Sequence, residues 1–213
     1  FAGCDALAAA IVAGDAPTNQ CPVGGSGVAE KVSKVMGAEP SSSTKRVAVV
    51  SCNGAKGSCL KKYEYYGATD CQQASAILGG DKACEFGCLG FGSCVKACSF
   101  GALSVNSEGV AVVNPELCTS CGKCAKACPK GIIRIVPYDK QVEVLCNSKD
   151  RGKTVKDKCK VGCIACGICK KNCPSDAIEI EGNLPKIDSE KCTSCGTCVQ
   201  KCPQKAIYRL KAS

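Results

Sequence analysis

Three segments of the chain carry cysteines at the spacing that binds iron–sulfur clusters. The pattern C-x2-C-x2-C-x3-C-P occurs in full at 118–129, 163–174 and 192–203. In two-cluster ferredoxins the first three cysteines of such a run hold one cluster and the fourth holds the other. The loop wraps one cuboidal cluster, and the fourth thiolate, one helical turn later, points toward the partner cluster. This spacing predicts bound [4Fe–4S] clusters and electron transfer.

A fourth run, at 84–98, lacks one cysteine because Phe91 stands at its position. When this run is aligned with its counterpart later in the chain, Phe91 falls on Cys166 and Cys84 falls on Cys159. We predict that Cys84 replaces the missing ligand, which leaves Cys159 surplus. The alternative is a lost or three-iron cluster with a free Cys84.

Exchanging the fourth cysteine between the two runs of each pair assigns ligands to four clusters. Iron is then held by these cysteines alone, and no residue is expected to be catalytic. The predicted ligand sets are Cys84, Cys88, Cys94 and Cys128 for cluster 1; Cys98, Cys118, Cys121 and Cys124 for cluster 2; Cys163, Cys166, Cys169 and Cys202 for cluster 3; and Cys173, Cys192, Cys195 and Cys198 for cluster 4.

The remaining cysteines in this part of the chain show no recognisable cluster spacing. They are Cys52, Cys59, Cys71, Cys146 and the surplus Cys159. Free cysteine commonly behaves as a small buried hydrophobe, which is one interpretation. The alternative is a further cluster that draws on Cys52, Cys59 and Cys71 with Cys146 or Cys159.

The composition argues against other kinds of site. The chain has 23 cysteines and no histidine among 213 residues, so it offers no Cys/His zinc site and no imidazole base. Zinc sites with four cysteines use two C-x2–4-C pairs, which is not the spacing found here. Glycine-rich phosphate loops are absent from the sequence, so we expect no nucleotide or flavin site. Aromatic residues are too sparse to favour nucleic-acid binding.

The repeated runs predict an α+β fold with two tandem bacterial-type 2[4Fe–4S] ferredoxin modules, made of short hairpins and short helices, after a small helical iron–sulfur domain fragment. Apolar residues alternate at 102–118 and 177–192, which predicts a hairpin in each. A helix is predicted at 5–14, ending at Gly14. The predicted units are 1–37 (the C-terminal part of a four-cysteine domain), 38–46 (a linker), 47–141 (first module with a preceding strand and an insertion) and 142–213 (second module with a preceding strand).

The formal net charge of +9 is partly a consequence of the clusters. Four oxidised [4Fe–4S] sites with their thiolates contribute roughly −8, which leaves about +1. The basic stretch 149–160 is therefore either a solvated face or a docking surface for an acidic partner. No apolar run reaches the roughly 18 residues of a membrane span. Because the chain begins without Met inside a patterned segment, we expect a further segment upstream.

The order of these parts resembles the B subunits of the Rnf ion-translocating ferredoxin:NAD oxidoreductase complex, in the long form of anaerobic bacteria. The segment "GCDALAAAIVAG…NQCPVGG" is similar to the end of their four-cysteine iron–sulfur domain, with Cys4 and Cys21 at the positions of its third and fourth ligands. The stretches "GCLGFGSCVKAC", "GCIACGIC" and "VEVLCNSKDRGK" are also similar. Phe91 departs from the family pattern, as does Ser99, which stands where proline usually follows a fourth cysteine.

This resemblance implies one more [4Fe–4S] cluster at the N-terminus, whose other two ligands lie upstream of this chain. It also implies an upstream membrane anchor helix and a place at the cell membrane, on the cytoplasmic side. Reduced ferredoxin, an acidic protein, would donate low-potential electrons, and other Rnf subunits would receive them and carry the NAD site, the flavins and the ion pump. The alternatives are a free soluble polyferredoxin and an iron–sulfur subunit of a soluble reductase.

Overall fold

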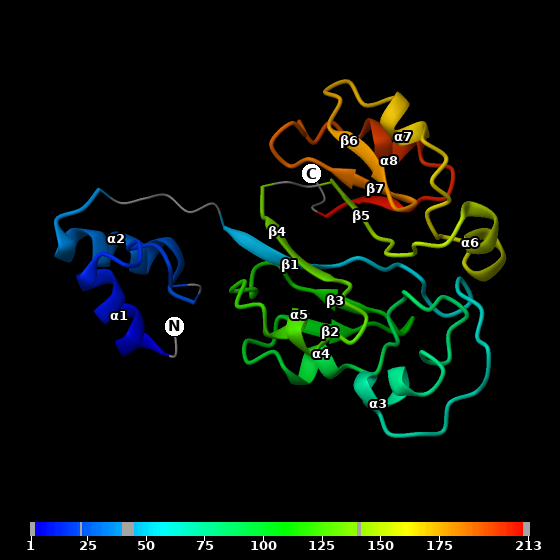
Figure 1. The fold of residues 1–213 in the computed structure, drawn as a ribbon, viewed down its shortest axis with the longest axis horizontal. Coiled ribbons are helices and arrows are strands. Elements are labelled where there is room, and N and C mark those ends of the chain that lie inside the picture. The colour runs from blue at the N-terminus through cyan, green and yellow to red at the C-terminus, as the bar shows by residue number, and fades with distance from the viewer. Residues whose placement is uncertain (1–2, 22, 40–44, 140–141, 211–213) are drawn as a thin grey trace.

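The cysteine-rich part of the chain is built twice on one plan (Figure 1). The structure, a computed structural model, describes residues 3–21, 23–39, 45–139 and 142–210. We call the part from β1 to β4 the first module and the part from β5 to β8 the second module. In each, the first and last strands pair, and an inner hairpin lies between two one-turn helices. The fold is α+β, as predicted.

The first module carries one helix that the second lacks, α3, which lies in the insertion before the incomplete run. Its elements are β1 (Arg46–Val50), α3 (Cys71–Ala76), α4 (Ser93–Lys96), β2 (Leu103–Val105), β3 (Ala111–Val113), α5 (Lys123–Ala127) and β4 (Ile133–Pro137). The second module has its own extra helix, α6, in the basic stretch. Its elements are β5 (Val142–Val144), α6 (Gly152–Lys158), α7 (Ile168–Lys171), β6 (Ile178–Glu181), β7 (Leu184–Ile187), α8 (Thr197–Lys201) and β8 (Ile207–Arg209).

All four sheets among the described residues are two-stranded and antiparallel. In the outer pairs, Val50 of β1 lies opposite Ile133 of β4, and Val144 of β5 lies opposite Ile207 of β8. The inner hairpins β2–β3 and β6–β7 fall where the alternating pattern predicted them. The sequence did not indicate the outer pairing, which joins strands from opposite ends of each module.

Each module has a small core in which cysteines pack with aliphatic side chains. In the first module Cys88, Cys94 and Cys124 are buried with Ile132 and other residues. In the second, Cys169 and Cys198 belong to the corresponding cluster. Because the chain has few large apolar residues, the cysteine side chains supply a substantial part of each core.

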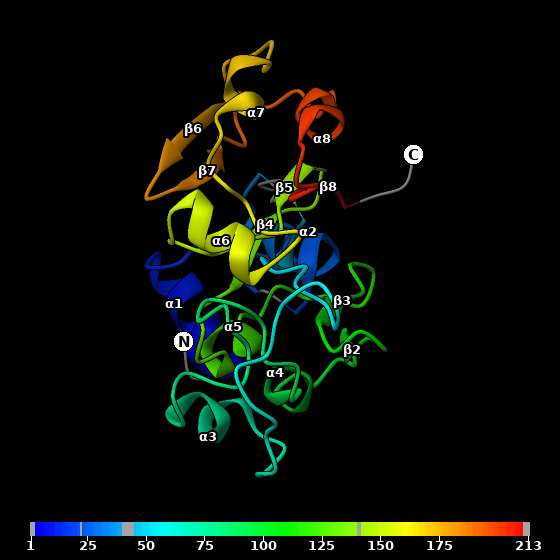
Figure 2. The same cartoon turned by 90° about the vertical axis from the view of Figure 1, so that its right-hand side faces the viewer.

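The two modules pack against each other through β1, which is buried on both faces. Val47 and Val49 of β1 and Val136 of β4 pack toward Leu145 and Leu210 of the second module. Further along the interface, α6 lies at the height where the modules meet (Figure 2). There the N–H of Leu60 donates to the carbonyl of Lys158 at 2.9 Å, so the insertion of the first module is tied to the end of α6.

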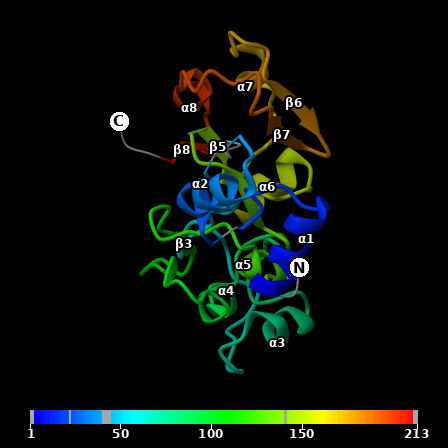
Figure 3. The ribbon, with the colours of Figure 1, turned by 90° about the vertical axis from the view of Figure 1, so that its left-hand side faces the viewer.

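The N-terminal part forms two helices, α1 (Cys4–Ala13) and α2 (Gly25–Met36), which lie beside the modules (Figure 3). Helix α1 ends at Gly14, whose φ of 82° is left-handed, and this confirms the predicted helix and its end. The loop between the helices is fixed by a hydrogen bond of 2.7 Å between the hydroxyls of Thr18 and Ser33.

Candidate iron–sulfur centres

All four cysteine runs form the same loop followed by a short helix. The helices α4, α5, α7 and α8 each begin after a glycine with left-handed backbone: Gly92, Gly122, Gly167 and Gly196, with φ of 75°, 73°, 75° and 81°. Glycine adopts this conformation without steric cost, so the glycines set the turn that brings the cysteines inward. The incomplete run has the same left-handed glycine, Gly92, so this turn forms with Phe91 at the position of the cysteine.

Two of the predicted ligand sets each line one small cavity. The cavity in the first module is lined by the cluster 2 set, Cys98, Cys118, Cys121 and Cys124. The cavity in the second module is lined by the cluster 3 set, Cys163, Cys166, Cys169 and Cys202. In both cases the fourth cysteine comes from the partner run, as the exchange rule predicts.

The cysteines of the cluster 4 set are also near one another in the second module. The negative charges of the Cys192 and Cys195 thiolates raise the pKa of the buried Cys198. The charge of Cys195 likewise acts to raise the pKa of Cys173. Burial raises the pKa of the Cys198 thiol to about 11. Partial burial raises the pKa of the Cys173 thiol, but hydrogen bonds from the N–H of Ala177 and from Ser175 outweigh this effect, so the pKa is lowered.

The incomplete run shares its cavity with a cysteine that the sequence interpretation did not assign. This cavity is lined by Cys71, Cys88, Cys94 and Cys128. Burial raises the pKa of the Cys94 thiol to about 12, and the neighbouring charges of Cys88, Cys71 and Cys128 act in the same direction. Cys71 thus stands where the predicted Cys84 was expected.

A short hydrogen-bonded chain holds Cys71 in this position. Asp70 caps α3 by accepting from the N–H groups of Gln72 and Gln73 at 2.8 and 3.1 Å. The hydroxyl of Ser93, the first residue of α4, donates to Asp70 at 2.9 Å and accepts from the N–H of Cys71 at 2.8 Å. The first residue of α3 is thereby fixed to the first residue of the cluster-binding helix.

Phe91 contributes to the same arrangement. Its ring packs on Tyr65 of the insertion, with ring centroids 5.1 Å apart. The residue that occupies the position of the missing cysteine therefore contacts the segment that supplies Cys71. A signal in the sequence could have found this ligand, because the one module that lacks a cysteine is also the one with an inserted cysteine-containing segment.

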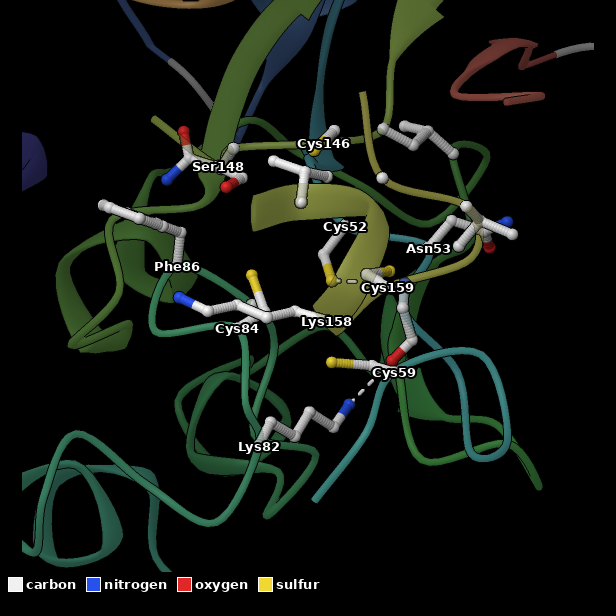
Figure 4. A pocket seen from close by; sticks show the side chains of 17 residues that line it. Cys52, Asn53, Cys59, Lys82, Cys84, Phe86, Cys146, Ser148, Lys158 and Cys159 are labelled. Atoms are coloured by element: carbon white, nitrogen blue, oxygen red, sulfur yellow. Dashed lines mark hydrogen bonds between the residues drawn. The ribbon is translucent and has the colours of Figure 1, made fainter. Parts of the chain in front are cut away.

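The prediction that Cys84 completes cluster 1 is not supported by the structure. Cys84 lines a different cavity, between the modules (Figure 4). The N–H of Gly87 donates to the carbonyl of Cys84 at 3.3 Å, so Cys84 lies in the turn immediately before the run. Burial raises the pKa of the Cys84 thiol to about 11, and its neighbours Cys59, Cys52 and Cys146 add to the shift.

The cysteine sets fit [4Fe–4S] clusters in the chemistry of their surroundings. Several of the sulfurs accept backbone N–H groups, such as Cys118 from Ala48 and Cys202 from Ala206, both at 3.3 Å. Such bonds to sulfur stabilise ligated thiolates and the reduced cluster. Cluster ligands bind different irons, so their sulfurs stand farther apart than ligands of one ion. Among the described residues, no group of three or more His, Cys, Asp or Glu is placed to hold a single metal ion.

Models of iron–sulfur families match most of the cysteine-rich segments. A 4Fe-4S dicluster domain matches residues 162–206, and 4Fe-4S binding domains match 111–134 and 88–102. A model for an Fe-S cluster matches residues 1–23. The matches indicate several [4Fe–4S] clusters in this chain.

Three curated proteins are similar over most of the chain. The B subunit of the Na(+)-translocating ferredoxin:NAD(+) oxidoreductase complex of Acetobacterium woodii is 49% identical over 89% of this chain and 57% of its own length. The B subunit of the ion-translocating oxidoreductase complex of Methanosarcina acetivorans is 49% identical over 90% of this chain and 72% of its own length. The chain belongs to the family of these B subunits. A third member, from Clostridium ljungdahlii and named for a proton-translocating complex, is 46% identical over 88% of this chain and 66% of its own length.

The chain therefore spans between just over half and nearly three quarters of the length of the B subunits it matches. Within the described residues no helix has the length and apolar character that crossing a membrane requires. The two N-terminal cysteines of this family member lie on different elements, Cys4 on helix α1 and Cys21 in the loop before helix α2. Cys4 is exposed at the start of α1, and the half-buried Cys21 accepts the N–H of Gly24 at 3.3 Å.

The second module of this family member presents cluster cysteines at the surface. Cys166 and Cys195 are exposed, whereas the first-module cysteines are buried or half-buried. The basic helix α6 begins against this site, because Gly152 packs on the carbonyl of Ile164 in the cluster 3 loop. Exposed lysines follow on α6 and α7, namely Lys153, Lys156, Lys170 and Lys171. The surface near cluster 3 is therefore positively charged.

Proposed function

We propose that this chain is the electron-transfer part of an ion-translocating ferredoxin:NAD oxidoreductase complex. It takes low-potential electrons from reduced ferredoxin and passes them through its [4Fe–4S] clusters to other subunits of the complex. The chain stands on the cytoplasmic side of the cell membrane and is held there by a segment outside its 213 residues. Substrate bond chemistry, NAD binding and ion transport belong to other subunits.

The observation that carries this proposal is the convergence of cysteine sets on separate small cavities in a member of the B-subunit family. Four sets in the two modules hold four clusters, with Cys71 as the fourth ligand of cluster 1. Cys4 and Cys21 supply half of an N-terminal cluster. When bound, the clusters supply one-electron redox centres. The protein sets their potentials through N–H groups directed at sulfur, through burial and through nearby charge.

Reduced ferredoxin docks on the second module in this proposal. Electron transfer between proteins requires a redox centre near the surface, and Cys166 is exposed. The lysines of α6 and α7 surround this place and attract an acidic donor, raising the rate of encounter at low ionic strength. The positive surface has a second effect, because lysine charge near a cluster favours its reduced and more negative state.

The test follows reduction of the anaerobically purified chain by reduced ferredoxin, recorded as loss of visible absorbance in a stopped-flow instrument. We expect rapid reduction that slows as salt is added. Clusters that dithionite reduces but reduced ferredoxin leaves oxidised at every salt concentration would overturn the proposal.

A further inference from the structure

Five cysteines line the cavity at the boundary of the two modules (Figure 4). They are Cys52, Cys59, Cys84, Cys146 and Cys159. None of them belongs to the four sets that line or surround the ferredoxin sites. The cavity is enclosed by both modules, including α6 of the second, and the side chains of Lys82 and Lys158 also line it.

Four of these cysteines are two pairs of corresponding positions in the repeat. Cys52 follows strand β1 and Cys146 follows strand β5. Cys84 and Cys159 each precede the first run of their module, and each has its carbonyl bonded at 3.3 Å by the N–H three residues later. Each module therefore contributes the same two positions to one shared cavity.

The sulfurs of the strand-end pair are placed as ligated thiolates are. Cys52 accepts the N–H of Gly54 at 3.4 Å and that of Cys88 at 3.3 Å. Cys146 accepts the N–H of Cys163 at 3.3 Å. Backbone donors directed at sulfur are the usual support of an iron-bound thiolate. Two of the three donors, Cys88 and Cys163, belong to the cluster 1 and cluster 3 sets, so the cavity lies next to both sites.

Cys59 has no counterpart in the second module, and its contacts set it apart. Its backbone forms an isolated antiparallel bridge with that of Cys159, and its thiol donates to the carbonyl of Leu60 at 3.6 Å. The other four cysteines come as the same two positions from each module, so Cys59 is the odd member of the five. Cys59 and Cys146 lie on opposite sides of the cavity, with Cys52, Cys84 and Cys159 between them (Figure 4).

A buried positive charge faces the same space. Lys82 is only 7% exposed, and its ammonium donates to the carbonyl of Gly54 at 2.8 Å. Within the described ranges it forms no salt bridge. A buried ammonium is costly unless negative charge lies nearby, and a [4Fe–4S] core with four thiolates carries about −2 when oxidised.

We propose that this cavity binds a fifth [4Fe–4S] cluster, shared between the modules and held by Cys52, Cys84, Cys146 and Cys159. The four thiols lose their protons when they bind iron. The site joins the two modules electrically: one electron leaves the cluster of one module, reduces the shared cluster, and then leaves it for the cluster of the other. The direction of this transfer rests on the proposed function, whereas the iron site itself does not.

The test counts iron and acid-labile sulfide in the anaerobically reconstituted full-length protein. The two modules and the shared site together hold about 20 irons, compared with about 16 from the four ferredoxin sites alone. Cys84→Ser and Cys146→Ser, each from a different module, are each expected to lose about four irons and four sulfides per chain relative to the parent. Cys59→Ser is the matched control, a buried cysteine of the same cavity, and is expected to retain them.

Two results would overturn the proposal. One is a parent protein with only the iron of its ferredoxin and N-terminal sites, including the case of zinc in the cavity. The other is iron loss in Cys59→Ser with full retention in Cys146→Ser, which would refute this ligand set. The Mössbauer iron count of the unsubstituted protein decides the first result even where a variant fails to fold. Because none of these readouts uses ferredoxin, failure of the electron-transfer proposal would be seen separately.

Discussion

Replacing Cys71 with alanine tests whether this cysteine, rather than Cys84, is the fourth ligand of cluster 1. Cys71 lines the cavity with Cys88, Cys94 and Cys128, so in the proposed assignment its loss removes one of four iron ligands. Burial raises the pKa of Cys94 to about 12, which makes its ionisation cost about 4 kcal/mol more than in water. Iron binding has to offset that cost, and three thiolates offset it less well than four. We expect the variant to lose about four irons per chain.

The second substitution restores what the first removes. Phe91 stands at the position of the second cysteine of the run, on a loop with the same left-handed glycine as the complete runs. Cys71→Ala combined with Phe91→Cys is therefore expected to regain the four irons. The rescue has a cost of roughly 0.5–1.5 kcal/mol, because the ring contact between Phe91 and Tyr65 is lost.

The assay is iron and sulfide per chain after anaerobic reconstitution, with EPR of the reduced protein. The matched control combines Cys84→Ala with Phe91→Cys, which is expected to show no rescue because Cys84 lines a different cavity. Full iron in Cys71→Ala, together with rescue of Cys84→Ala by Phe91→Cys, would refute the assignment and restore Cys84 as the ligand.

Three further predictions follow from the contacts around these sites. Asp70→Ala removes the cap of α3 and its bond to Ser93, so it should destabilise the protein and speed iron loss to a chelator. Asp157→Ala, which removes an exposed acid on α6, should do neither. Lys170→Glu with Lys171→Glu should slow reduction by reduced ferredoxin most strongly at low salt, and the same reversal at the exposed Lys31 and Lys34 of α2 should leave the rate unchanged. Arg134 forms a salt bridge with Glu143, and its guanidinium also donates to the Ser51 hydroxyl and the Val144 carbonyl. Arg134→Gln should therefore lower the free energy of unfolding by roughly 1–3 kcal/mol, and Glu143→Gln, which loses only the salt bridge, by about 1 kcal/mol or less. Burial raises the pKa of Glu143 above its usual 4.5. The stability that this shift contributes is present below pH 4.5 and is lost as the pH rises through the raised pKa. Glu143→Gln should remove this pH dependence.

The repeated spacing of cysteines was enough to predict the fold and to group the cysteines that line two of the cavities. The reason is that three ligands of a run come from one loop, and the fourth is identified by the repeat. The cavity lined by Cys163, Cys166, Cys169 and Cys202 illustrates this. Local spacing carries the information because the loop backbone, with glycine before each short helix, is nearly the same in every run.

Long-range placement was not readable in the same way. Cys71 has no cluster spacing to the run it joins, and what brings it there is a helix cap and a hydroxyl on α4. The five cysteines between the modules come from separate segments, which only the tertiary fold brings to one cavity. Spacing reports on a loop, whereas these groups are formed by contacts between elements.

The pairing of each module's first strand with its last has a consequence for how such proteins can be built. Val50 opposite Ile133 and Val144 opposite Ile207 place the two ends of a module side by side. A segment whose ends meet can be copied in tandem, or moved into an unrelated chain, through a short join that leaves the metal-binding loops undisturbed. The architecture is therefore suited to lengthening by duplication, with each added copy bringing its own pair of cysteine runs.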